Sequence, residues 1–337
     1  MRICSIILAT IIMAFSQCTN QTNQSLLLVD TSDTTLTVQL LKLTEKIEED
    51  NLNDEYYYLR SMEWIKINKL SNALVDISSA LDLKPENAVY NFKKGEYLMA
   101  SDSIDVQEAK KSYLKAIQLE PTFEDAHFKL GQLYLARQEY ENALASFDQL
   151  IEIDINNAHA YFWKGIAYKE NKFKGQAEEM FFKAVSVDNN YYNAYMQLGD
   201  LFVDKDPKNA LQFYDNALRV NAKSDEALYA KGRIYQNQFK FKDAYAAYSQ
   251  AVLENPGHKF ASFGKAYIDI KFENYDNALK TLDNIINMAP DYSNALTLRG
   301  YAFEQLNEPK NALADYQKAL EINPTDSIAK KGLQLLQ

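Results

Sequence analysis

The side chains that could carry metal or acid–base chemistry are few in this sequence and lie far apart. Its 337 residues include three histidines, His127, His159 and His258, and two cysteines, Cys4 and Cys18. No H-x-x-x-H or H-E-x-x-H spacing pairs a histidine, and no G-x-S-x-G motif or glycine-rich phosphate loop occurs. Catalysis needs several such groups in one place. We therefore expect no enzyme activity, no catalytic residue, no cofactor and no metal site.

The charge balance limits the class of partner. There are 46 acidic and 36 basic residues, giving a formal net charge of −10. No cluster of lysines and arginines stands out along the sequence, whereas binding to a nucleic-acid backbone needs a basic stripe. We therefore expect no nucleic-acid partner.

The first residues predict export. Met1-Arg2 is a short basic start, and residues 3–15 form an apolar run. Such a run is too short to span a bilayer comfortably and fits the apolar region of a secretory signal peptide, which we assign to residues 1–17. Residues 18–33 begin with an uncharged polar tract and are expected to form a polar tether.

The junction after this segment resembles that of a bacterial lipoprotein. Cys18 is followed by the polar tether, and the resemblance implies a lipid on this cysteine and anchoring to a membrane. Thr19 in place of Asp favours the outer membrane, with the protein facing the periplasm. Gln17 stands where the family has a small residue. Cleavage after Ser16, giving a soluble periplasmic or secreted protein, is therefore the alternative.

An alanine recurs along the rest of the chain at intervals of 33 to 36 residues. Its positions are Ala73, Ala109, Ala143, Ala177, Ala210, Ala244, Ala278 and Ala312. Within one interval, residues 124–157, apolar side chains at helical spacing predict two helices separated by a polar turn at Arg137–Glu139. Five of the seven prolines fall just past a predicted second helix, where proline ends helices. A period of this size indicates a stack of helical repeats.

The repeat resembles the tetratricopeptide repeat (TPR). The unit at residues 225–258 matches the family pattern at Gly232, Tyr235, Ala244, Tyr248, Ala251 and Pro256. This resemblance implies an all-α fold, an α-solenoid of about eight helix–turn–helix repeats over residues 54–326 that forms a right-handed superhelix. Capping helices are expected at residues 34–53 and 327–337. In the unit at residues 259–292, Gly264 and Ala266 compete for the small position of the first helix.

The resemblance also places a concave groove on the first helices. The groove-facing residues that we single out are Tyr58, Phe92, Phe128, His159, Phe162, Trp163, Met196, Asp200, Tyr229 and Arg233. Aromatic residues at helical spacing are more often core than site. The alternative to this core interpretation is that Phe162, Trp163, Met196 and Tyr229 anchor an apolar peptide or helix, as aromatic residues do in many interfaces.

These features favour an exported, lipid-anchored scaffold for protein–protein interaction. Its partner would be another protein, bound as a peptide or helix in the groove, in envelope assembly or secretion. The alternative is a carbohydrate- or peptidoglycan-binding module that stacks sugars on the groove aromatics. No oligomeric state follows from the sequence.

Overall fold

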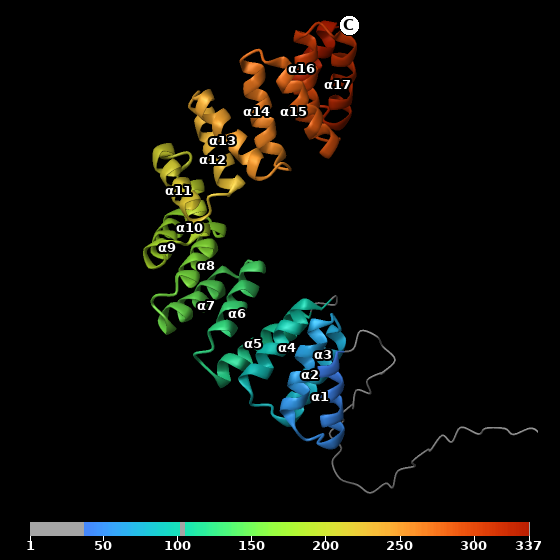
Figure 1. Ribbon diagram of the computed structural model, residues 1–337. Coiled ribbons are helices and arrows are strands. Elements are labelled where there is room, and N and C mark those ends of the chain that lie inside the picture. Colours follow the sequence, from blue (N-terminus) through green and yellow to red (C-terminus); the bar gives the residue numbers. More distant parts are fainter. Residues whose placement is uncertain (1–36, 102–104, 337) are drawn as a thin grey trace, which may run out of the picture. The chain divides into compact units, whose positions relative to one another are not determined.

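The chain is all-helical in the part that the structure describes. The computed structural model describes residues 37–101 and 105–336, which form eighteen α-helices and no strand (Figure 1). This confirms the expected all-α class. The signal segment, Cys18 and the polar tether lie outside the described residues. None of the described helices is long and apolar enough to cross a membrane.

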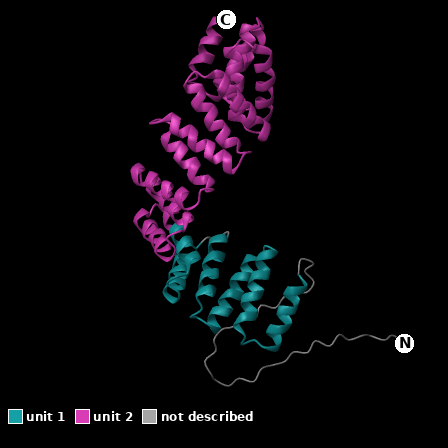
Figure 2. Ribbon diagram, turned by 60° about the vertical axis from the view of Figure 1, so that its left-hand side comes forward, with its two compact units in different colours: residues 1–133 teal, residues 134–337 magenta. Residues whose placement is uncertain are grey.

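The chain divides into two compact units, residues 1–133 and 134–337 (Figure 2). The helices that begin in unit 1 are α1 (Val38–Glu49), α2 (Asp54–Lys66), α3 (Leu70–Leu83), α4 (Ala88–Ala100), α5 (Val106–Leu119) and α6 (Glu124–Ala136). Helix α1 lies within the segment expected to cap the first repeat. It packs on α2 and buries Leu40, Leu43 and Ile47.

Unit 2 continues the same alternation of first and second helices. Its helices are α7 (Tyr140–Ile153), α8 (Ala158–Glu170), α9 (Lys174–Val187), α10 (Tyr192–Phe202), α11 (Pro207–Val220), α12 (Asp225–Asn237), α13 (Phe241–Glu254), α14 (Lys259–Lys271), α15 (Tyr275–Met288), α16 (Ser293–Gln305), α17 (Pro309–Ile322) and α18 (Ser327–Leu336). Each first helix from α8 to α16 packs on the second helix that follows it.

A tight turn joins most first helices to their second helices. Its middle residue has a left-handed backbone, with φ between 58° and 67°, at Asn68, Gln138, Lys172, Phe239, Glu273 and Asn307. The next amide donates to a carbonyl five residues back, as Lys240 N does to Tyr235 O at 2.9 Å. This arrangement ends the first helix and reverses the chain at once.

Aromatic rings of second helices pack against small residues on first helices. A Cβ placed on Gly232 of α12 would lie 2.5 Å from the ring of Tyr248 on α13. The ring fills the space that the missing side chain leaves, so the two helices can approach closely.

The same ring explains the two small residues that compete in the unit at residues 259–292. A Cβ on Gly264 would also lie 2.5 Å from Tyr248, on the opposite edge of the ring. Ala266 is fully buried and belongs to the cluster that contains Leu282 of α15. Gly264 therefore serves the preceding repeat, and Ala266 serves its own.

Candidate functional site

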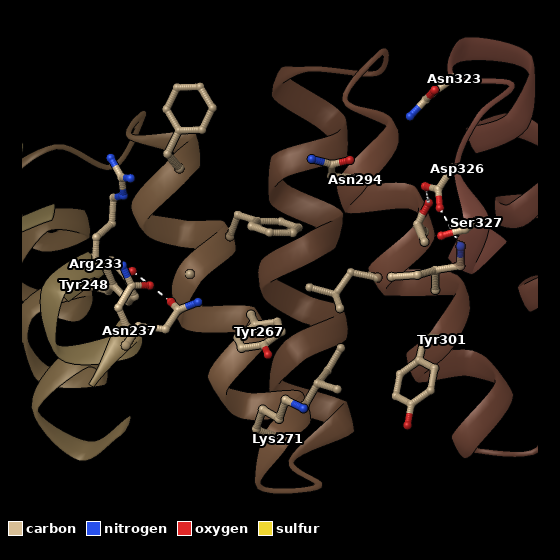
Figure 3. A pocket seen from close by; sticks show the side chains of 18 of the residues that line it. Arg233, Asn237, Tyr248, Tyr267, Lys271, Asn294, Tyr301, Asn323, Asp326 and Ser327 are labelled. Atoms are coloured by element: carbon tan, nitrogen blue, oxygen red, sulfur yellow. Dashed lines mark hydrogen bonds between the residues drawn. The ribbon is translucent and has the colours of Figure 1, made fainter. Parts of the chain in front are cut away.

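Two neighbouring cavities open on the first helices of unit 2. The larger, about 1030 Å³, lies over α12, α14, α16 and the start of α18 (Figure 3). The smaller, about 250 Å³, lies over α10 and α12. Because both are lined by Tyr229, Arg233, Asn237 and Phe260, they form one surface, which we call the unit 2 groove.

Aromatic rings line the middle of the unit 2 groove. The ring centroid of Tyr229 lies 4.9 Å from that of His258 and 6.3 Å from that of Phe260. The Phe260 ring in turn lies 6.1 Å from the ring of Tyr292. Phe260 keeps 47% of its surface exposed. A partner that covered it would remove apolar surface from water.

Arg233 stands at the junction of the two cavities. Its guanidinium carbon lies 5.9 Å from the centroid of the Tyr229 ring, a cation–π contact. Among the described residues Arg233 forms no ion pair, although it is exposed beside the acidic side chains of Asp200 and Glu226. Its donors are therefore available to a bound molecule.

Two acidic residues of the groove have structural partners. Asp200 accepts a hydrogen bond from the Tyr214 hydroxyl at 2.7 Å; burial, together with this hydrogen bond, raises the pKa of Tyr214. Asp326 caps α18 through the amides of Ile328 and Ala329. The acidic residues Asp200, Glu226, Glu273 and Asp326 outnumber Arg233 and Lys271 in the lining. The groove is therefore net negative.

The structure brings four of the ten expected groove residues together. Met196, Asp200, Tyr229 and Arg233 all line the smaller cavity, from α10 and α12. Tyr58, Phe92 and Phe128 belong to unit 1 and are not part of the unit 2 groove. Tyr58 and Phe128 are half-buried.

Two of the expected residues are core side chains. Phe92 is 4% exposed and packs on Phe123, with ring centroids 4.9 Å apart. Phe162 is 8% exposed and packs on Tyr191 at 5.2 Å. Neither ring offers much surface to a partner, and here the competing core interpretation describes the packing.

His159 and Trp163 form a pair on α8, outside the residues that line the groove. The indole Nε1 of Trp163 donates to Nε2 of His159 at 3.0 Å. Burial lowers the pKa of His159, so the neutral ring that accepts this hydrogen bond is favoured. The pair is a local contact between successive turns of one helix.

Several residues of the groove were not singled out from the sequence. They are Asn237, Phe260, Phe263, Tyr267, Lys271, Asn294, Leu298 and Tyr301. One signal was present, because Phe263 is the fifth residue of α14, as Tyr229 is of α12 and Met196 of α10. The competing small residues of this unit hid that correspondence. In residues 37–101 and 105–336, no group of three or more His, Cys, Asp or Glu side chains could hold a metal ion.

Models of repeat families match several parts of the chain. The Tetratricopeptide repeat model matches residues 293–326, and a TPR repeat model matches residues 105–138 and 131–172. The model of Anaphase-promoting complex, cyclosome, subunit 3 matches residues 203–285.

Curated relatives match larger parts of the sequence. Anaphase-promoting complex subunit 3 of Schizosaccharomyces pombe is 27% identical over 217 residues, which cover 64% of this chain and 28% of that protein. The human DnaJ homolog subfamily C member 3 is 23% identical over 329 residues, covering 83% of this chain and 62% of that protein. The chain thus spans less than two thirds of the length of each of these relatives.

Solved structures share the fold. Pseudomonas aeruginosa pilF aligns with a TM-score of 0.55 and 17% identity, covering 64% of this chain and 97% of that one. The C-terminal part of a TPR repeat-containing protein from Cytophaga hutchinsonii aligns with a TM-score of 0.57 and 16% identity, covering 73% of this chain and 98% of that one. At these identities the likeness shows the fold alone. With the repeat matches and the paired helices, it identifies the chain as a tetratricopeptide-repeat protein.

Proposed function

We propose that this chain is a protein-interaction scaffold that binds a segment of a partner protein in the unit 2 groove. The observation that carries the proposal is the pair of adjoining cavities that share Tyr229, Arg233, Asn237 and Phe260. A half-exposed phenylalanine and an arginine that forms no ion pair with any described residue make the kind of centre from which interfaces gain most of their affinity. Repeat arrays present extended surfaces of this sort.

The groove suggests the chemistry of the bound segment. Its aromatic and aliphatic lining suits apolar side chains, and its excess of carboxylates suits a segment with net positive charge. Added salt should weaken the association, because exposed charges are screened within about 10 Å at 0.1 M ionic strength. Binding by sugar stacking on the aromatics would change little with salt.

The proposal also covers the number of repeats, the superhelix that they form and the location of the protein in the cell. The eight pairs of first and second helices between residues 54 and 322 fit eight TPR repeats. Such repeats would wind into a right-handed superhelix. The N-terminal sequence favours export and a lipid on Cys18, which would hold the scaffold at the periplasmic side of an outer membrane. The process served would be envelope assembly or secretion.

The binding site can be tested by crosslinking and affinity purification of the tagged full chain from detergent-solubilised membranes. The wild type is compared with Arg233→Ala/Phe260→Ala, and Phe173→Ala is the control because Phe173, 48% exposed, lies outside the groove. A stoichiometric protein lost only from the groove variant supports the proposal. A partner retained by the variant places the site elsewhere. Glycan without protein in the eluate would favour the carbohydrate-binding alternative.

The lipid anchor needs a separate test. Labelled fatty acid should enter the wild-type chain and not a Cys18→Ser variant. Equal labelling of both, or labelling of neither, would refute the lipoprotein proposal and leave cleavage after Ser16 as the better interpretation.

A further inference from the structure

A basic residue recurs at the seventh position of most first helices. The residues are Arg60, Lys94, Lys164, Lys231, Lys265 and Arg299. The ion pairs that the structure gives these residues show how the fold compensates such a charge between packed helices.

Four of these cations pair with an aspartate from a second helix. Arg60 contacts Asp76 and Arg299 contacts Asp315, each at 2.7 Å, and both aspartates are the seventh residue of the second helix in the same repeat. The other partners are the ninth residue of the preceding second helix, as in Lys164–Asp148, Lys231–Asp215 and Arg299–Asp283. Each of these charges is therefore compensated by the array itself.

Lys265 lacks both aspartates but has another carboxylate. Ser249 and Thr281 occupy the two places in its neighbouring second helices. The Lys265 charge instead acts on Asp269, a buried residue of the same helix.

Lys94 on α4 is surrounded differently. The seventh residue of α5 is Ser112 and the ninth residue of α3 is Ser78, so neither place holds a carboxylate. Lys94 reaches Glu108 at 3.0 Å, but that carboxylate also contacts Lys111 at 3.6 Å. The hydrogen bond from Lys94 is the main cause that lowers the pKa of Glu108. One carboxylate thus serves two lysines.

A cleft of about 700 Å³ opens beside Lys94 in unit 1, between the second helices α3 and α5. Its lining includes four lysines, Lys94, Lys110, Lys111 and Lys115, and a single carboxylate, that of Glu108, which gives a net charge of +3. Three of these lysines lie within six residues of α5, and the packing of α4 on α5 adds Lys94. Ser112, only 4% exposed, also lines the cleft. This local charge is opposite to the −10 of the whole chain.

We propose that this lysine cleft binds a phosphate-bearing ligand with at least two negative charges. Ammonium groups bind phosphate oxygens as point charges, and several together can hold several anionic oxygens. The volume lies within the range of small-ligand sites. The ligand could be a free phosphate compound or the headgroup of an anionic lipid, since both offer the same chemistry. The cleft shares no residue with the unit 2 groove, so this proposal stands apart from the proposed scaffold function.

A residue found in other repeats of this chain provides a substitution that tests the cleft. Ser112→Asp introduces the carboxylate that α3 and α17 carry at the same place, so the fold has a precedent for it and Lys94 gains an internal partner. Lys111→Gln/Lys115→Gln removes charge at the cleft without adding a carboxylate. Lys231→Gln is the matched control, because it removes one cation from a first helix whose charge is already compensated by Asp215.

The experiment uses the full chain carrying Cys18→Ser, so that no lipid contributes to membrane binding. Tripolyphosphate is titrated calorimetrically at low salt, and vesicles of phosphatidylcholine with or without phosphatidylglycerol are tested by co-sedimentation. We expect at least a tenfold loss of affinity in both cleft variants and less than a twofold change in Lys231→Gln. Circular dichroism verifies folding, and if Ser112→Asp does not fold, the double lysine variant decides.

Each outcome has a defined meaning. Binding of tripolyphosphate alone assigns the cleft to free phosphate compounds, and binding of phosphatidylglycerol vesicles alone assigns it to a lipid headgroup. Absence of both in the wild type overturns the proposal. So does an equal loss in Lys231→Gln, which would show a general effect of charge, or unchanged binding in the folded cleft variants.

Discussion

Gly332 of α18 lies directly against the ring of Tyr316 of α17, so that a Cβ at Gly332 would overlap the ring carbon Cε2. Gly264 of α14 has the same relation to Tyr248 of α13, and both glycines are the sixth residue of their helices. The last helix therefore packs as the first helix of a following repeat would. The helix expected to cap the array therefore makes the same contact that joins one repeat to the next.

The glycine contact predicts a stability difference. Gly332→Ala should lower the free energy of unfolding by about 1–2 kcal/mol, because overpacking outweighs the gain in helix propensity. The ring has little room to move, since Gly300 of α16 packs on its other edge. Denaturant unfolding followed by circular dichroism measures the change. Gly175→Ala is the control: nothing lies within 4 Å of its Cβ, so stability should hold or rise by under about 1 kcal/mol.

Loss of the aspartate should destabilise the fold more in the buried ion pair Arg60–Asp76 than in the more exposed pair Arg299–Asp283. Arg60 and Asp76 have side chains 1% and 0% exposed, and Trp64 Nε1 also donates to Asp76. Asp76→Ala leaves a buried guanidinium without its partner and should cost about 3–5 kcal/mol. Asp283→Ala should cost under about 1 kcal/mol, because Asp283 is 52% exposed and Arg299 keeps Asp315. Equal losses in urea unfolding would contradict this ranking.

Phe260 should matter for binding and little for folding. Phe260→Ala removes a 47% exposed ring of the unit 2 groove, so unfolding free energy should change by under about 1 kcal/mol. Affinity for the captured partner should fall by about tenfold or more, as for other central aromatic contacts. Surface plasmon resonance gives the affinities, with Phe173→Ala as the variant expected to bind normally. A similar loss in both variants would argue against a local site.

Asp269 predicts how stability depends on pH. Its side chain is 3% exposed, and within the described residues Oδ2 has no hydrogen-bond partner. Burial raises the pKa of Asp269, although the charge of Lys265 opposes the shift. The folded state therefore binds this proton more tightly than the unfolded state. The Asp269 contribution to stability should increase as pH falls from the raised folded pKa towards the ordinary value near 4.

The neutral variant Asp269→Asn isolates this effect. It should raise the unfolding free energy at pH 7 and flatten its dependence on pH between about 7 and 4, relative to the wild type. Thermal unfolding at several pH values measures both. An unchanged pH profile would show that ionisation of Asp269 costs the fold nothing.

Much of the fold could be predicted from the sequence because its determinants are local. The alanine period, the apolar spacing within residues 124–157 and the prolines after second helices all act between near neighbours on the chain. They predicted an all-helical repeat protein, and the helices lie where these patterns indicated. The candidate site was harder, because which first-helix residues remain exposed depends on rings supplied by other helices.

Particular residues show why the candidate site could not be predicted fully from the sequence. Phe92 and Phe162 share the fifth position of their helices with Tyr229. Phe123 and Tyr191 pack on the first two, which are buried. His258 packs on Tyr229, yet Tyr229 stays partly exposed and lines a cavity. Lys94 and Lys111 share the Glu108 carboxylate only because α4 packs on α5. The sequence by itself determined the helices and their period, since hydrophobic spacing and helix-ending residues act over a few positions. Tertiary packing decided which side chains are covered and which charges meet, because both depend on neighbours from another helix or repeat.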